Sequence, residues 1–332
     1  SAHRNGVKVT GTIFFPWGDS EFVEQAMTQF TEQDEDGNFI IADKLFEIAE
    51  YYGFEGFFMN QESQVSSELA KKLKEMLIYI QQNKPEGFVM QWYDSMLPNG
   101  GISYQNGINT NNIGMIQDGD QRINDEVFLN FNWNRSKIDT SIDTMVDAGR
   151  SPYDIFASWE YFPYSKDPGR VEHLIDDDNV IRTSIGLLSP TVTLTNSVGP
   201  EDFQNVQDAK LWVGPSSDPT DTTRVAGQFP GISSLVADRT PIIGTNFVTH
   251  FTAGNGYKFY EEGIVTKNEE WHNRSLTDVM PTWRWIVESN GAKLSPSIDY
   301  ADAYFAGTSL KVEGKLEAAH PNHIKLYSTK LD

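Results

Sequence analysis

The chain contains no cysteine among its 332 residues. Disulfide bonds, thiolate zinc sites and cysteine nucleophiles are therefore excluded. It also lacks an apolar run of about 18 residues, so no membrane insertion is expected. The six histidines are scattered without the spacing of metal ligands, and neither a glycine-rich phosphate loop nor a nucleophile elbow occurs. No metal or other cofactor is expected.

Basic residues are few. The chain has 26 Lys and Arg against 47 Asp and Glu, a net charge of −21. Nucleic acid and anionic membranes both attract basic surfaces, so this balance argues against either partner. Aromatic residues make up 12% of the chain and include eight Trp. Neutral sugars are commonly held by aromatic faces and polar side chains, although any single Trp more often belongs to the core.

Apolar runs typical of buried strands alternate with amphipathic helical patterns. Strands are expected at residues 7–15, 57–62, 88–94, 127–133, 154–161, 182–188, 242–247 and 282–287. Helices are expected at residues 20–33, 41–52, 67–83 and 201–213, and in a stretch that ends near residue 148. This alternation favours a parallel α/β sheet, and the length suits a (β/α)8 TIM barrel over residues 1–290. Residues 291–332 contain short alternating apolar and polar patterns and no helical pattern, which indicates the start of a β-sandwich domain.

The segment Gly56-Phe-Phe-Met-Asn-Gln-Glu62 ends a predicted strand with an amide and a carboxylate two positions apart. Side chains alternate along a strand, so Asn60 and Glu62 are expected to point to the same side. In a parallel barrel, catalytic groups lie at the C-terminal ends of the strands. By itself the pattern is weak, because a turn asparagine and a solvated glutamate would look the same.

Two further predicted strands end in polar or aromatic groups, namely Tyr93-Asp94 and Asn130-Phe-Asn132-Trp133. If these ends converge with Glu62, they form an aromatic cleft with an acid, which suits glycoside hydrolysis. An amide such as Asn60 cannot be the nucleophile, but it could orient a 2-acetamido group whose own oxygen attacks C1. The alternative is a two-carboxylate glycosidase in which Asp94 or Glu160 serves as nucleophile.

Several stretches taken together resemble glycoside hydrolase family 85, the endo-β-N-acetylglucosaminidases. They are His3-Arg-Asn-Gly-Val7 leading to Gly11-Thr-Ile-Phe-Phe15, Ala49 to Glu62, Gln91-Trp-Tyr-Asp-Ser95, Phe128 to Trp133, Thr245-Asn-Phe247, and Ser275 to Trp285. The family normally has an aromatic-rich strand upstream of the first of these stretches. That strand is absent here, and we expect the missing segment to exist elsewhere in the native protein.

The resemblance implies a (β/α)8 barrel that cleaves the GlcNAc-β-1,4-GlcNAc bond in the core of N-linked glycans and also transfers the glycan through an oxazoline. It implies that Glu62 is the general acid/base, that Asn60 positions the 2-acetamido group, and that Tyr93 lines the same site. Contacts with substrate are expected from Trp17, Trp133, Trp159, Asn132 and Asp94. An extracellular or cell-surface location and additional β-sandwich domains are also expected. A barrel that binds glycans without cleaving them remains the other alternative.

Overall fold

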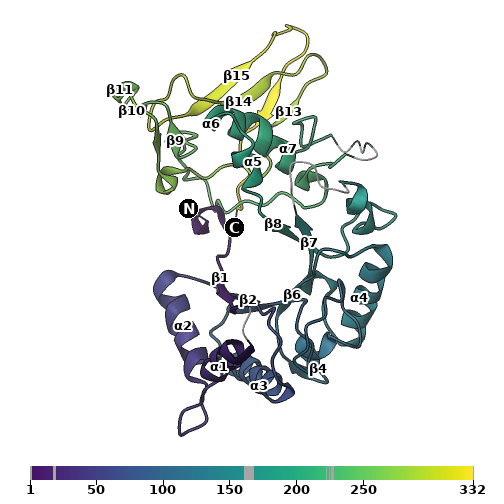
Figure 1. Cartoon of the computed structure of the whole chain (residues 1–332). Helices are drawn as coiled ribbons and strands as arrows, with labels where there is room; N and C mark the ends of the chain where they lie inside the picture. Colours follow the sequence, from purple (N-terminus) through teal and green to yellow (C-terminus); the bar gives the residue numbers. More distant parts are fainter. Residues whose placement is uncertain are drawn as a thin grey trace. The chain divides into compact units, whose positions relative to one another are not determined.

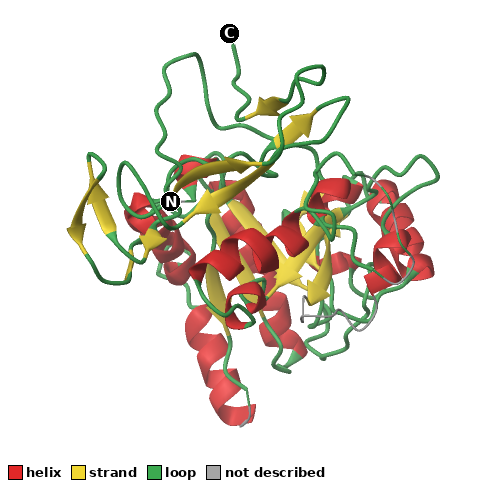
Figure 2. Ribbon diagram, turned by 90° about the horizontal axis from the view of Figure 1, so that it is seen from above, coloured by secondary structure: helices red, strands yellow, loops and turns green. Residues whose placement is uncertain are grey.

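The computed structural model describes residues 2–17, 20–160, 168–221, 223, 225 and 228–331 (Figure 1). Its contacts divide the chain into two units, which are described separately. One comprises residues 8–160 and 170–188, and the other residues 1–7, 161–169 and 189–332. Figure 2 shows the helices, strands and loops of both units in a second view. These units are defined by contacts alone, and the domain boundary near residue 290 stays a prediction.

The unit of residues 8–160 and 170–188 is built on six parallel strands in the order β1-β2-β3-β6-β7-β8. The strands are β1 (Gly11–Phe14), β2 (Gly56–Asn60), β3 (Val89–Tyr93), β6 (Glu126–Phe128), β7 (Ile155–Glu160) and β8 (Ser184–Leu188). Every strand pairs with the one that follows it in this series. The order never reverses, as it would in a doubly wound sheet, so the sheet is wound in one direction, as in a barrel.

Helices α1 to α4 lie on the outer side of this curved sheet (Figure 1). They are α1 (Ser20–Phe30), α2 (Ile40–Tyr52), α3 (Ser67–Asn83) and α4 (Arg135–Asp147). The side chains of Ser66 and Asn134 cap α3 and α4 by accepting bonds from backbone N–H groups in the first turn. The unit also contains β4 (Gln117–Asp118), β5 (Gln121–Arg122), η2 (Ile113–Met115), η3 (Pro152–Asp154) and most of η4 (Pro168–His173).

Side-chain alternation along the strands separates the core from the opposite face of the sheet. Met59 and Met90 are fully buried in the core beneath the helices. Their neighbours Asn60 and Gln91 face the other way and line a cleft. Gly56 allows β2 and β3 to approach closely at their start, because a Cβ there would lie 1.9 Å from the carbonyl oxygen of Val89.

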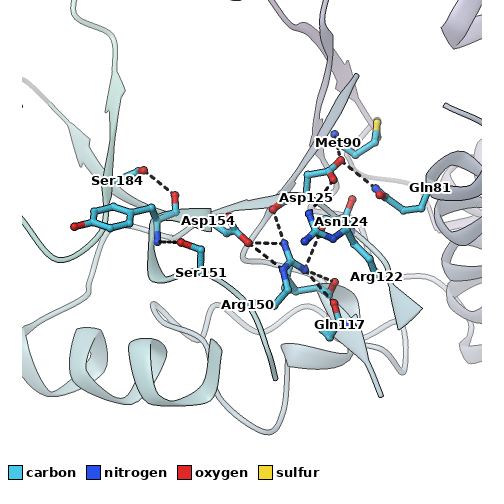
Figure 3. Close-up of polar contacts among 12 residues, drawn as sticks. Gln81, Met90, Gln117, Arg122, Asn124, Asp125, Arg150, Ser151, Asp154 and Ser184 are labelled. Carbon is cyan, nitrogen blue, oxygen red and sulfur yellow. Dashed lines mark hydrogen bonds and ion pairs between the residues drawn. The ribbon is translucent and has the colours of Figure 1, made fainter. Parts of the chain in front are cut away.

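A buried arginine organises the N-terminal ends of the strands (Figure 3). The Arg150 side chain is 2% exposed, and it forms an ion pair of 2.9 Å with Asp154, just before β7. Its guanidinium also donates to the carbonyl oxygens of Ile116, Asn124 and Asp125. Hydrogen bonds thus stabilise the N-terminal end of the sheet, which lies opposite Asn60.

The unit of residues 1–7, 161–169 and 189–332 contains short helices and small antiparallel strand pairs. Its helices are η1 (His3–Asn5), α5 (Val192–Thr195), α6 (Pro200–Asp202), the π-helix η5 (Phe203–Gln207), α7 (Asp208–Trp212), η6 (Ile232–Ser234) and η7 (Arg274–Leu276). Its strands are β9 (Asn255–Gly256), β10 (Phe259–Glu261), β11 (Ile264–Lys267), β12 (Trp271–His272), β13 (Ile286–Glu288), β14 (Ser295–Asp299), β15 (Ser309–Glu313) and β16 (His323–Lys325).

The expected closed barrel of eight strands is not what the described residues form. Six expected strands are present, with residue 161 outside the described part. The other two do not join the sheet. In residues 242–247, Ile243 makes a single bridge to Lys330, and Gly244 has a left-handed backbone with φ +75°. In residues 282–287 the backbone of Arg284 is likewise left-handed, with φ +71°. Such residues interrupt an extended strand, so the sheet is open at β1 and at β8.

Residues 291–332 contain the hairpin of β14 and β15, and β16, which pairs with β13. These pairs agree with the strand character expected there, whereas a β-sandwich remains a prediction. Within the described residues, no helix is long and apolar enough to cross a bilayer.

Candidate active site

Asn60 and Glu62 lie at the C-terminal end of β2, and both line the same cleft, as the alternation predicted. Gln61, between them, points the other way and is fully buried. Its side-chain amide donates 2.9 Å to the carbonyl oxygen of Ser63 and accepts 3.1 Å from the backbone N–H of Ser63. The buried glutamine therefore fixes the turn that presents Asn60 and Glu62.

The cleft on the open face of the sheet, called here the sheet cleft, has a volume of about 510 Å³. Its lining includes Thr12, Phe58, Asn60, Glu62, Tyr93 and Phe128. Glu62 is the one carboxylate among the lining residues that the structure describes. Within the described part of the chain, the Asn60 side chain makes no hydrogen bond, so its amide is available to a ligand.

Tyr93 ends β3 beside Glu62 and is 7% exposed. Its hydroxyl donates 2.8 Å to Oδ1 of Asn130, on the loop after β6. Burial, followed by the negative charge of Glu62, raises the pKa of the Tyr93 phenol far above its usual range. Tyr93 is therefore a neutral hydrogen-bonding group whose aromatic ring forms one wall of the sheet cleft.

A second tyrosine contacts the acid directly. Tyr104 lies on the loop after β3, and its hydroxyl donates 2.9 Å to Oε1 of Glu62. The rings of Tyr93 and Tyr104 are 6.2 Å apart. Burial, followed by the hydrogen bond to Glu62, raises the pKa of Tyr104 to about 12. Glu62 is thus held on one side by a phenol donor.

Glu62 also lines a second cleft, called here the loop cleft, with a volume of about 740 Å³. It is lined by side chains that include Trp17, Val23, Glu24, Val65, Ile102 and Tyr104. Trp17 is 63% exposed, so its indole face is open. Glu62 therefore lies where the sheet cleft and the loop cleft meet. Of the three tryptophans predicted to contact substrate, Trp17 is the one whose surroundings suit that role.

Asp94 has a different place from the one expected. It is 2% exposed, and burial raises the pKa of its carboxyl group. Its oxygens accept hydrogen bonds from the side-chain amide of Asn112 and from three backbone N–H groups, those of Gln105, Gly107 and Asn130. Asp94 lines neither cleft and holds the following loop in shape, so its geometry does not support substrate contact.

The remaining expected contacts also lie outside both clefts. Trp133 and Trp159 are 3% and 4% exposed, with ring centres 6.4 Å apart. The guanidinium of Arg170 lies 4.0 Å over the Trp133 ring, so that face is covered. Asn132 is exposed but lines neither cleft, and its backbone N–H donates 2.9 Å to Asn106. A buried indole offers no free face to a sugar, so the burial of these two residues does not support their assignment.

The sequence did not identify Tyr104 or Asn106 as site residues. Both lie in the Gly- and Asn-rich segment of residues 98–124. Composition indicated that such a loop decorates an active face, but nothing in it singled out one tyrosine.

Comparison with known proteins agrees with this geometry. The family model described as "Glycosyl hydrolase family 85" matches residues 1–259. The chain belongs to this family. A family 85 structure, the glycoside hydrolase domain of Endo-D from Streptococcus pneumoniae R6, superimposes with a TM-score of 0.90 at 36% identity. The alignment covers 99% of this chain and 53% of that one.

Curated relatives of this family 85 chain include the cytosolic endo-beta-N-acetylglucosaminidases of Danio rerio and Homo sapiens. They are 26% and 24% identical, and each match covers 95% of this chain. The chain spans about two fifths of their length, 41% and 39%. These names contradict the extracellular or cell-surface location expected from the sequence, since they describe cytosolic proteins.

Proposed function

We propose that this chain carries the active site of an endo-β-N-acetylglucosaminidase. It would hydrolyse the GlcNAc-β-1,4-GlcNAc bond in the core of N-linked glycans and leave one GlcNAc on the protein. Membership of family 85 and the names of the curated relatives support this activity. The sheet cleft and the loop cleft, which meet at Glu62, suit an enzyme that binds sugar on both sides of the cleaved bond.

The observation that carries the mechanism is the pair of Asn60 and Glu62 in one cleft. A glycosidase that retains configuration needs a nucleophile about 5 Å from its acid, and this is usually a second carboxylate. Among the described lining residues of the sheet cleft, Glu62 alone carries one. Asn60, whose amide is not engaged, favours a reaction in which the substrate's own acetamide supplies the nucleophile.

The proposed reaction has two steps. Glu62 donates a proton to O4 of the leaving GlcNAc while the acetamide oxygen attacks C1, which yields an oxazolinium. The Oδ1 atom of Asn60 accepts the acetamide N–H and so orients the attacking oxygen. Glu62, now ionised, removes a proton from water as the water attacks C1, and the anomeric configuration is retained. A sugar hydroxyl in place of water would give transglycosylation.

The two-carboxylate alternative receives less support. Asp94 is occupied by four N–H donors and lines neither cleft. Glu160 is exposed at the end of β7 and also lines neither cleft. A barrel that binds glycans without cleaving them would not need an acid between two clefts.

We also propose that the six parallel strands represent six of the eight strands of a (β/α)8 barrel, and that residues 291–332 begin a β-sandwich. The single direction of winding supports the first proposal. The hairpin of β14 and β15 supports the second. Residues 1–290 would then form the catalytic domain.

The deciding experiment is incubation of the chain with one defined N-glycoprotein, followed by mass spectrometry. We expect a released glycan that ends in a single reducing GlcNAc, and a protein that retains one GlcNAc per site. Release of the intact glycan, or no release while the glycan binds tightly, would overturn the proposal. A covalent glycosyl-enzyme on Asp or Glu would support the two-carboxylate alternative.

A further inference from the structure

The loop that follows β3 brings Tyr104 onto Glu62 across 42 positions of the sequence. Tyr104 is 43% exposed and is not held by burial alone. Its phenol reaches Oε1 of Glu62 at 2.9 Å. Because Tyr104 and Glu62 are distant in the sequence, their contact persists only if the loop that carries Tyr104 is held in place. The hydrogen bonds around this loop show how it is held.

Two side chains fix the loop at the residue that follows Tyr104. The carboxylate of Asp94 accepts the backbone N–H of Gln105, the residue next to Tyr104. The ammonium of Lys137, on α4, donates 2.9 Å to the carbonyl oxygen of Gln105. A buried carboxylate and a helix lysine thus bind the same peptide segment, which restricts its movement.

An amide bridge connects this loop with the other tyrosine. Asn106 has a left-handed backbone with φ +55°, and its side-chain N–H donates 2.9 Å to the carbonyl oxygen of Tyr104. Its Oδ1 accepts 2.7 Å from the side-chain amide of Asn130. Asn130 in turn accepts from the hydroxyl of Tyr93. The positions of the two phenols beside Glu62 are therefore coupled through two asparagines.

We propose that Tyr104 is a positioning residue for Glu62, which holds Oε1 so that Oε2 is the oxygen that gives and takes the proton. This inference rests on the proposed function. With Glu62 protonated on Oε2, that oxygen donates to O4 of the leaving GlcNAc. After the first step, the same oxygen takes a proton from the attacking water. Tyr104 keeps its own proton throughout and donates its hydrogen bond to Oε1.

Two other titratable groups that the structure describes lie near Glu62. Tyr93 faces it from β3, and Glu24 of α1 lines the loop cleft with it. Glu24 accepts 2.6 Å from the backbone N–H of Ser66, so it is engaged at the start of α3. The hydroxyl of Tyr93 donates 2.8 Å to Asn130, whereas the hydroxyl of Tyr104 donates 2.9 Å to Oε1 of Glu62, so the loss of the Tyr104 hydroxyl removes that interaction.

The test compares kcat and KM of Tyr104→Phe with those of the unmodified chain, using a defined N-glycoprotein. We expect kcat to fall about tenfold while KM changes less than about twofold, because the aromatic ring is kept.

Tyr153→Phe is the matched control. Tyr153 is also exposed, and its hydroxyl donates 2.9 Å to the carbonyl oxygen of Ile181, outside both clefts. Its kcat and KM should match those of the unmodified chain. A Tyr104→Phe variant that matches this control, or whose loss lies in KM and not in kcat, would overturn the role of Tyr104. If the unmodified chain itself releases no glycan, the proposed function fails first, and this inference with it.

Discussion

The hydroxyl of Tyr93 donates a hydrogen bond of 2.8 Å to Oδ1 of Asn130, and so joins the end of β3 to the loop that follows β6. The bond holds the uncharged phenol in the cleft that Glu62 also lines. Because burial and the nearby Glu62 raise the pKa of Tyr93 far above its usual range, the phenol stays protonated at neutral pH. Its contribution is therefore a fixed neutral dipole.

Removal of this hydroxyl should slow the reaction. For Tyr93→Phe we expect kcat to fall by about tenfold to a hundredfold, since a preorganised donor near the developing charge is lost. Initial rates of glycan release over a range of substrate concentrations check this, and an unchanged kcat would contradict the role of the hydroxyl.

Replacement of the acid should have the largest effect. Glu62→Gln keeps the shape of the side chain and removes its proton, so hydrolysis of a natural N-glycoprotein should fall by about a thousandfold or more. Glu160→Gln is the matched control, because Glu160 ends β7 and is exposed outside both clefts. It should retain most of the activity. Initial rates of glycan release measure both, and substantial residual activity in Glu62→Gln would remove that residue from the mechanism.

Asn60 should contribute most to the rate of the step that forms the oxazoline. Asn60→Ala removes the acceptor that orients the acetamide, so we expect about a hundredfold loss with the natural substrate. A preformed oxazoline donor bypasses that step, and the loss with it should stay within about tenfold. Asn83→Ala, at the end of α3 and exposed, serves as the control. Equal losses on both donors would argue against an acetamide-orienting role.

The sequence was sufficient for the parts of the site that depend on local pattern. The apolar runs that became β2 and β3 are continuous, and strand alternation alone places Asn60 and Glu62 on one side. The helices follow from their apolar periodicity. These features need no knowledge of distant contacts.

Other features depend on contacts that no local pattern encodes. Tyr104 reaches Glu62 because Asp94, which is buried, holds the loop through backbone N–H groups. Aromatic composition could not distinguish Trp17, which is exposed, from Trp133, whose ring is packed in the core. The two expected strands that do not join the sheet have apolar residues but left-handed backbones at Gly244 and Arg284.

The network around Arg150 gives a prediction about stability alone. Its guanidinium satisfies three backbone carbonyl oxygens and the carboxylate of Asp154 (Figure 3). A lysine ammonium cannot reproduce this fork, so Arg150→Lys leaves buried carbonyl groups without donors. We expect the free energy of unfolding to fall by about 2–4 kcal/mol, as measured by chemical denaturation. Arg122→Lys should cost less than about 1 kcal/mol, because the Arg122 side chain is 48% exposed and its ion pair with Asp125 is 3.4 Å long.

Measurement of kcat and KM distinguishes this effect on stability from an effect on the active site. Asp154 and Asp125 precede β7 and β6, so the network lies at the N-terminal ends of the strands, opposite Glu62. At a temperature where Arg150→Lys is still folded, its kcat and KM should match those of the unmodified chain within about twofold. If kcat falls while the free energy of unfolding is unchanged, the two ends of the sheet are coupled, and the interpretation of Arg150 as a purely stabilising residue is wrong.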